Sequence, residues 1–158
     1  MNKKYYIHYG SEHFDKEKFK PIKIQKIDIP TVIFNKPNGG YWASRSDAKY
    51  GWKAFCITND LYNMDVMPYT VFALKNSAKI YAIDSLKDLD WLVEYGLAQT
   101  FFECPKVYQI DFEKMMNRHD AIELNMSNDY NNLYRPMYDW DCDSILIMNP
   151  DIIEEVDA

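Results

Sequence analysis

Short stretches in which apolar and polar side chains alternate run along most of this chain, a pattern typical of strands with one buried face. Residues 3–8 show it first, with Tyr5 and Ile7 on one side of the expected strand and Tyr6 and His8 on the other. Further strands are expected at residues 41–43, 69–74, 79–83, 107–110, 121–126 and 144–148, with a short extension at 152–153.

Helical signals are fewer and lie between these strands. Asp84 or Ser85 is a suitable N-cap for a helix that Gly96 ends. A shorter helix is expected at residues 111–117. Residues 12–36 have no clear period and predict a turn, a short helix and an extended connection.

Many short strands and a few flanking helices predict an α+β fold with a split, mixed or antiparallel sheet, rather than an alternating parallel one. The chain has 158 residues, of which 47% are apolar, so one domain spanning residues 1–158 can bury a sizeable core. The net charge of −6 argues against a broad phosphate-neutralising face, so nucleic acid is not the expected partner. The lysines of the first third leave a local basic patch open.

No stretch of the sequence has the pattern of a signal peptide or a membrane span, and the three cysteines are scattered. A cytoplasmic protein with reduced thiols and no membrane partner is therefore expected. Asp139, Asp141 and Asp143 alternate along one segment, but the glycine and distal glutamate of an oxygen-rich metal loop are missing. No metal site is predicted.

The most informative segment is the glycine turn and aromatic strand at residues 39–43. Two glycines permit a tight turn, and the strand after it leads to Ser44 or Ser46 as a helix N-cap, with Asp47 in the first turn. Aromatic side chains follow at helical spacing, namely Tyr50, Trp52 and Phe55. Such a stripe fits either a buried core or a slot for a flat ring ligand.

Three polar side chains stand at the edges of expected strands. His8 precedes Gly10 and Ser11 at the end of the first strand, Tyr41 follows the glycine turn, and Asp143 precedes the apolar strand 144–148. Their order and local context resemble the ADP-ribosyltransferase superfamily, in the branch with a His-Tyr-acid triad. The second motif of that family is similar to Gly40-Tyr41-Trp42-Ala43 followed by Ala48-Lys49-Tyr50.

The resemblance implies an ADP-ribosyltransferase-like fold and NAD as the bound substrate. By this analogy, Asp143 stabilises the oxocarbenium-like ribose, and Tyr41 with Tyr50 or Trp52 forms the two walls of a nicotinamide slot. The backbone of Gly10 binds the carboxamide. The remaining NAD-binding positions are His8 and Ser11 at the adenosine ribose, and Ala43 and Ser44 in the second motif.

The sequence departs from the family at the acid. The usual residue there is Glu, and Asp143 is one methylene shorter, so Asp141 and Glu123 stay open as rivals for the same role. The choice between Tyr50 and Trp52 as the second stacking ring also stays open.

The expected function is transfer of ADP-ribose from NAD to a macromolecule, in the first place a protein, or hydrolysis of NAD without an acceptor. Small transferases of this kind often act as bacterial or phage effectors. In relatives that modify proteins a loop before the acid selects the target, and here residues 130–141, with Arg135 and Tyr138, take that position. The alternatives are a non-catalytic domain that binds a protein through its tyrosines, and a binder of another nucleotide that has no need of Asp143.

Overall fold

A computed structural model describes residues 3–23, 35–103 and 106–156 of the chain. Seven strands form one sheet in the order β4-β7-β8-β2-β1-β3-β9, and β5 and β6 form a separate two-stranded ribbon. The strands are β1 (Tyr5–Tyr9), β2 (Tyr41–Arg45), β3 (Tyr69–Leu74), β4 (Ile80–Ile83), β5 (Ala98–Glu103), β6 (Lys106–Ile110), β7 (Ala121–Leu124), β8 (Ser144–Ile147) and β9 (Ile153–Glu155). The α-helices are α1 (Trp52–Thr58), α2 (Leu86–Glu94), α3 (Phe112–Met116) and α4 (Tyr130–Leu133). Short 3-10 helices lie at Lys16–Lys18, Met126–Asn128, Tyr138–Trp140 and Pro150–Ile152.

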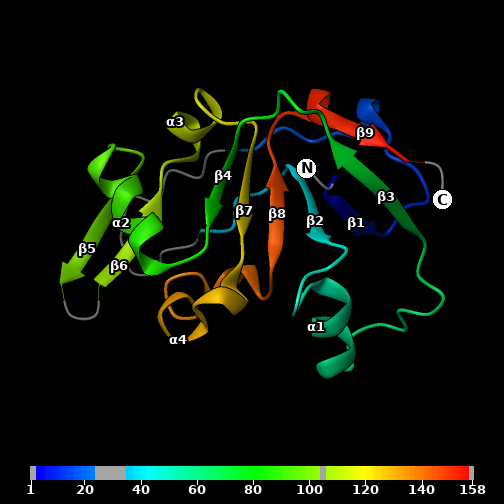
Figure 1. Ribbon diagram of the computed structural model, residues 1–158, viewed down its shortest axis with the longest axis horizontal. Coiled ribbons are helices and arrows are strands. Elements are labelled where there is room, and N and C mark those ends of the chain that lie inside the picture. Colours follow the sequence, from blue (N-terminus) through cyan, green and yellow to red (C-terminus); the bar gives the residue numbers. More distant parts are fainter. Residues whose placement is uncertain (1–2, 24–34, 104–105, 157–158) are drawn as a thin grey trace.

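The sheet is mixed but mostly antiparallel, as the sequence predicted. Only β4 and β7 run parallel, and every other neighbouring pair is antiparallel. Figure 1 shows α2 and the β5–β6 ribbon at one end of the sheet, beyond β4, and α1 at the lower end of β2. The prediction of a mixed α and β chain with few helices is confirmed.

The sheet opens between two neighbouring strands, the central strand β2 and β1 beside it. These strands are paired only at Tyr6 with Arg45 and at Ile7 with Ser44, whereas the first three residues of β2 pair with β8. The second half of β1 continues along β3 on its other side. The two strands therefore diverge beyond Ile7.

Apolar side chains fill both faces of the sheet. The larger core packs Ile122 and Leu146 of the sheet against Leu89 of α2, Tyr108 of β6 and Met115 of α3. The smaller core on the other face contains Tyr6, Phe72, Ile145 and Ile147. Burial on both faces is why β8 reads as a continuous apolar run rather than an alternating one.

The local end signals of α2 work as predicted. The Asp88 carboxylate accepts the backbone N–H of Ser85 at 2.8 Å, which makes Ser85 the N-cap. Gly96 follows the helix with a φ of 69°, a left-handed conformation that glycine adopts without strain. The short helix at 111–117 is also present, as α3.

The helix expected from Asp47 starts later, which corrects that prediction. Asp47 lies in a turn and binds Arg45 through both carboxylate oxygens, and the helix starts at Trp52 with Gly51 as its N-cap residue. Ser44 belongs to β2, yet its hydroxyl accepts the backbone N–H of Trp52 at 2.9 Å. A side chain of β2 thus accepts one of the free backbone N–H groups at the start of α1. The usual N-cap pattern places that acceptor next to the helix, so it could not predict a partner eight residues earlier in the chain.

One strand was missed. β5 lies at Ala98–Glu103, where two adjacent phenylalanines interrupt any alternation of apolar and polar residues. No helix among the described residues is long and apolar enough to cross a membrane.

Candidate functional site

A cavity of about 270 Å³ lies where β1 and β2 diverge. It is lined by Ile7, His8, Tyr9, Lys36, Trp42, Ala43, Ser44, Trp52, Trp140 and Ser144. Four of the residues named from the sequence, namely His8, Ala43, Ser44 and Trp52, therefore meet in one place. They come from β1, β2 and the first residue of α1.

Indole rings form much of the cavity wall. Trp42 and Trp140 meet edge to face with their centroids 4.8 Å apart, and the Trp42 Nε1–H donates to the Gly39 carbonyl at 3.2 Å. Trp52 lines the same cavity and stacks on Phe55 at 5.5 Å. A flat ring that entered the cavity would meet aromatic faces, which favour offset stacking or edge-to-face contact.

His8 is held in one tautomer by its neighbour on β2. Its Nδ1 lies 2.7 Å from the Trp42 carbonyl oxygen, and a carbonyl can only accept, so Nδ1 carries the hydrogen. Burial lowers the pKa of His8 below its ordinary value. The neutral ring therefore keeps Nε2 as a hydrogen-bond acceptor, while its face stacks on Tyr41 at 4.1 Å.

A cation and a carboxylate meet at the exposed side of the cavity. The Lys36 Nζ lies 5.6 Å from the centroid of the Trp42 ring and 2.7 Å from the Asp141 Oδ2. The side chains of Lys36 and Asp141 are 39% and 32% exposed, so both reach solvent. Asp141 holds a positive φ of 68°, a conformation that costs free energy for a residue other than glycine.

Asn35 fixes the backbone that carries Lys36. Its side chain is buried and donates to the Tyr108 and Pro136 carbonyls at 3.0 and 3.1 Å, and it accepts the Ile110 N–H at 3.0 Å. Its backbone N–H donates to Asp139, and its carbonyl accepts the Trp140 indole N–H. A fully bonded buried amide of this kind leaves the segment little freedom.

The carboxylate of Asp143 is occupied by the protein itself. The residue is only 5% exposed, and its oxygens accept the Ser127 N–H at 2.8 Å, the Ser127 hydroxyl at 2.7 Å and the Tyr50 N–H at 3.3 Å. Asp143 does not line the cavity, although Ser144 does. Its carbonyl accepts the Ser44 hydroxyl at 2.8 Å, so Asp143 joins β2, β8 and the Tyr50 turn.

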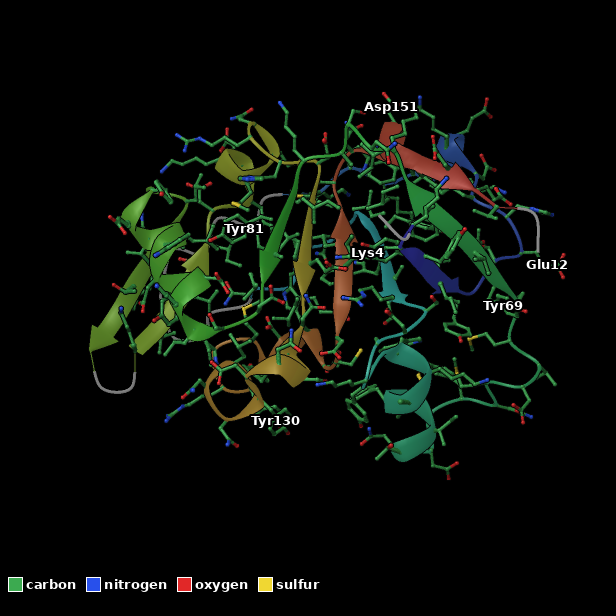
Figure 2. All side chains as sticks on the ribbon, in the orientation of Figure 1. Lys4, Glu12, Tyr69, Tyr81, Tyr130 and Asp151 are labelled. Atoms are coloured by element: carbon green, nitrogen blue, oxygen red, sulfur yellow. The ribbon has the colours of Figure 1, made fainter. Side chains whose placement is uncertain are left out.

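The rival acids differ in their surroundings. Glu123 is 2% exposed and binds the Tyr6 hydroxyl at 3.0 Å and Lys4 at 3.4 Å. Figure 2 shows Lys4 over the middle of the sheet. Of the three acids named from the sequence, Asp141 is the one whose side-chain carboxylate is bonded to a residue that lines the cavity.

Tyr41 and Ser11 lie in a neighbouring hollow of about 600 Å³, which shares His8 and Trp42 with the cavity. The Tyr41 hydroxyl is buried without a hydrogen bond of good geometry. Burial raises the pKa of Tyr41, and the nearby Thr70 and Ser11 hydroxyls limit that rise. Tyr41 is thus a wall of the adjoining hollow and a support for the His8 ring.

The Gly10 N–H donates to the Pro68 carbonyl at 2.8 Å, so that group is already used. The Tyr50 ring packs edge-on against Phe55 at 6.4 Å and does not line the cavity. Of the two candidate second rings, Trp52 is the one at the cavity.

A larger hollow of about 710 Å³ lies between α1 and the start of β3. It shares Ile7, Tyr9, Ser44 and Trp52 with the cavity, and it is also lined by Tyr69, which Figure 2 labels at the start of β3. The three hollows together follow the opening in the sheet.

Sequence reasoning assigned no role to Trp42 or Trp140, and it considered Lys36 only as one of the lysines of the first third that leave a local basic patch open. Trp42 had a usable signal, because it shares a strand face with Ser44 two residues on. Lys36 and Trp140 reach the cavity from distant segments, and no local pattern marks them. Within the described residues, no three His, Cys, Asp or Glu side chains are grouped so as to hold a metal ion.

Comparison with known proteins returned no matching family model, no matching curated protein and no matching solved structure. The function must therefore be argued from the site alone.

Proposed function

We propose that this protein binds NAD with its nicotinamide end in the cavity, and transfers ADP-ribose to a macromolecular acceptor or hydrolyses NAD when no acceptor is present. One observation carries the proposal: the divergence of β1 and β2 gathers His8, Ala43, Ser44 and Trp52 around a cavity walled by indoles. These positions are spread over the chain, and the resemblance to ADP-ribosyltransferases named them together.

The ring slot that we propose differs from the expected one. Trp42 and Trp52 are both at the cavity, whereas Tyr41 lies in the adjoining hollow and Tyr50 outside it. An indole face attracts a cation, and the nicotinamide ring of NAD carries a positive charge until the glycosidic bond breaks. Trp42 and Trp52 are therefore assigned as the walls of the slot.

The acid in this proposal is Asp141. In the reaction, the bond between the ribose C1′ and the nicotinamide nitrogen breaks with its electron pair leaving on nicotinamide. A lone pair of the acceptor, or of water, then bonds to C1′, and the attacking group loses a proton. A carboxylate near the ribose stabilises the oxocarbenium-like transition state, and the Asp141 carboxylate is accessible while that of Asp143 is enclosed.

The first experiment is calorimetric titration with NAD followed by assay of released nicotinamide. Trp52→Ala should weaken NAD binding by about tenfold or more, because one wall of the slot is lost. Trp91→Ala is the matched control, since Trp91 is 45% exposed on α2 and lines none of the three hollows described. Equal affinities of both variants would remove Trp52 from the slot.

The acid is tested by a pair of substitutions. Asp141→Asn should lower turnover by about a hundredfold or more with NAD still bound, because a transition-state interaction is removed. Asp143→Asn should lower thermal stability through its contacts with Ser127 and Tyr50. Full turnover in Asp141→Asn, with loss in a folded Asp143→Asn, would return the role to Asp143.

A protein acceptor fits the surface beside Asp141. Tyr130, Tyr134 and Tyr138 are 52%, 49% and 50% exposed, and the first two rings lie 5.1 Å apart. Exposed tyrosines are common anchors in protein interfaces. The segment 130–141 with Arg135 is therefore proposed to select the acceptor.

Cys56 and Cys142 are buried free thiols, which supports a reducing, cytoplasmic setting.

The second candidate is a domain of the same fold that binds a nucleotide or a protein without turnover. The enclosed carboxylate of Asp143 favours it, because the position expected for the acid serves the fold. Binding of NAD with no release of nicotinamide, in the presence and absence of cell protein as acceptor, would select this candidate.

A further inference from the structure

We propose that Lys36 is an anion site at the mouth of the cavity, which selects ligands that carry a phosphate beside a flat ring. The proposal deepens the proposed function, on which it rests, and concerns a residue that no sequence motif identified. Three features support it: the position of Lys36 at the cavity, the buried Asn35 beside it, and the ion pair of Lys36 with Asp141.

Lys36 lines the cavity and also reaches solvent. Its side chain lines the cavity and is 39% exposed, and its Nζ stands over the Trp42 ring at 5.6 Å. An anionic group attached to a ring stacked on Trp42 would lie within the reach of this ammonium group. Among the described residues that line the cavity, Lys36 is the only lysine or arginine, and burial lowers the pKa of the one histidine there, His8.

The position of Lys36 is fixed rather than accidental. Its neighbour Asn35 is 2% exposed and bonds through both its backbone groups and its side chain to Tyr108, Ile110, Pro136, Asp139 and Trp140. A flexible lysine loses much side-chain entropy when it binds a ligand, and an anchored backbone reduces the remaining cost.

Asp141 acts as the internal counter-ion of this site. Its Oδ2 accepts from the Lys36 Nζ at 2.7 Å. Asp141 is the C-cap residue of the 3-10 helix Tyr138–Trp140 and has a positive φ of 68°. An ammonium group has three N–H donors, so Lys36 can bind a phosphate oxygen while one donor stays with Asp141. The negative charge of Asp141 opposes the phosphate, so the carboxylate moderates its affinity.

The charge of the whole chain favours a local cation at a phosphate site. With a net charge of −6 the protein repels anionic ligands at long range, and a phosphate needs a close positive partner to bind. Charge-assisted hydrogen bonds to phosphate are among the stronger polar contacts. Lys36 supplies that contact at the cavity.

The test compares two ligands that differ by one phosphate. Nicotinamide mononucleotide and nicotinamide riboside are titrated into the full chain and into Lys36→Met. The unmodified protein should bind the mononucleotide about tenfold or more tightly than the riboside, and Lys36→Met should lose most of that ratio. Asp141→Asn should increase it by a few fold, because the competing charge is gone.

Lys106→Met is the matched control. Lys106 also stands over an aromatic ring, at 5.3 Å from the Tyr108 centroid, and also pairs with an aspartate, Asp90. It lies on the β5–β6 ribbon and lines none of the three hollows described. Its loss should leave the ratio unchanged.

The outcomes separate this proposal from the function on which it rests. Equal binding of both nicotinamide ligands, or a phosphate preference that survives in Lys36→Met, overturns the anion site while NAD binding and turnover stand. If NAD fails to bind, the nicotinamide proposal is wrong. The anion site is then tested by comparing the affinities of the same variants for adenosine monophosphate and for adenosine. A preference that depends on Lys36 supports the anion site, and absence of binding to all these ligands overturns it.

Discussion

The same three groups, a lysine, an aromatic ring and an aspartate, meet at two places in the described part of this protein. On the ribbon, Lys106 stands over Tyr108 and pairs with Asp90 of α2. At the cavity, Lys36 stands over Trp42 and pairs with Asp141. The lysine side chains are 45% and 39% exposed, so solvent screens both pairs to a similar degree.

The two places differ in what surrounds the pair. Asp90 of α2, the aspartate paired with Lys106, also accepts the Tyr108 hydroxyl at 2.7 Å, so the ring, the cation and the acid satisfy one another between α2 and the ribbon. The cavity pair borders an empty space walled by Trp42, Trp52 and Trp140. An ion pair is therefore no sign of function by itself, and the adjoining cavity and the buried Asn35 support distinguish Lys36.

The largest expected effect comes from removing that support. Asn35→Ala leaves the Tyr108 and Pro136 carbonyls and the Ile110 N–H without their partner. Unpaired buried polar groups should lower the free energy of unfolding by about 3 kcal/mol. In a domain of this size the melting temperature should fall by roughly 6–12 °C, measured by calorimetry.

Asn59→Ala serves as the control for Asn35→Ala. Asn59 also donates its side-chain N–H to a carbonyl, that of Phe55 at 2.8 Å, but it is exposed. Its loss should shift the melting temperature by about 2 °C or less, since water replaces the bond. Similar shifts in the two variants would mean that the Asn35 contacts do not hold the Lys36 segment.

The next largest effect is expected from mild acid, which should reduce the stability contributed by His8 at the cavity and leave the Lys106–Asp90 pair intact. Burial lowers the pKa of His8 at the cavity, so as pH falls below about 6.5 the unfolded chain takes up a proton before the folded one does. Stability is therefore full above that pH and falls as pH decreases toward the folded pKa. On the ribbon, Lys106 and Tyr108 hold the pKa of Asp90 below its usual range, so its pair persists through this window.

Unfolding curves of His8→Gln across this pH range test the assignment, and the variant should lose part of the acid dependence. His13→Gln is a control of opposite sign. Glu155 raises the pKa of His13, so its contribution is present below about pH 6.5 and is lost as pH rises through the folded pKa. An acid dependence that is the same in His8→Gln as in the unmodified chain would contradict the assignment.

The smallest effect is expected from the lysines themselves. Lys36→Met and Lys106→Met should each change the melting temperature by about 2 °C or less, because exposed ion pairs add little to stability. The two variants should therefore be alike in thermal unfolding and differ only in ligand selection. A large loss of stability in Lys36→Met alone would give this residue a structural role.

Much of the fold follows from local sequence. The expected strands at residues 3–8, 69–74, 79–83, 121–126 and 144–148 are all present within a residue or two of their bounds. The helix between Ser85 and Gly96 is also where its cap and its glycine predict it. Such signals work because alternation, N-caps and left-handed glycines act within a few residues of one another.

The site was only partly accessible to the same reasoning. His8, Ala43, Ser44 and Trp52 meet at the cavity, but Tyr41 and Ser11 line the next hollow and Asp143 is enclosed. The sequence put Asp143 first as the acid and left Asp141 and Glu123 open, because a firm choice needs to know which carboxylate is already bonded. The Asp143 carboxylate accepts hydrogen bonds from Ser127 and Tyr50, and the local sequence around Asp143 predicts neither contact.

By itself, then, the sequence determined the mixed α and β class, most strands, the end signals of α2 and a short set of polar and aromatic candidates. Only the tertiary structure decided where the sheet opens, which ring shares the cavity with Trp52, and that Lys36, which lines the cavity, binds Asp141. The physical reason is range. Backbone geometry repeats over a few residues, whereas cavities, burial and charge pairs join side chains that only the folded chain brings together.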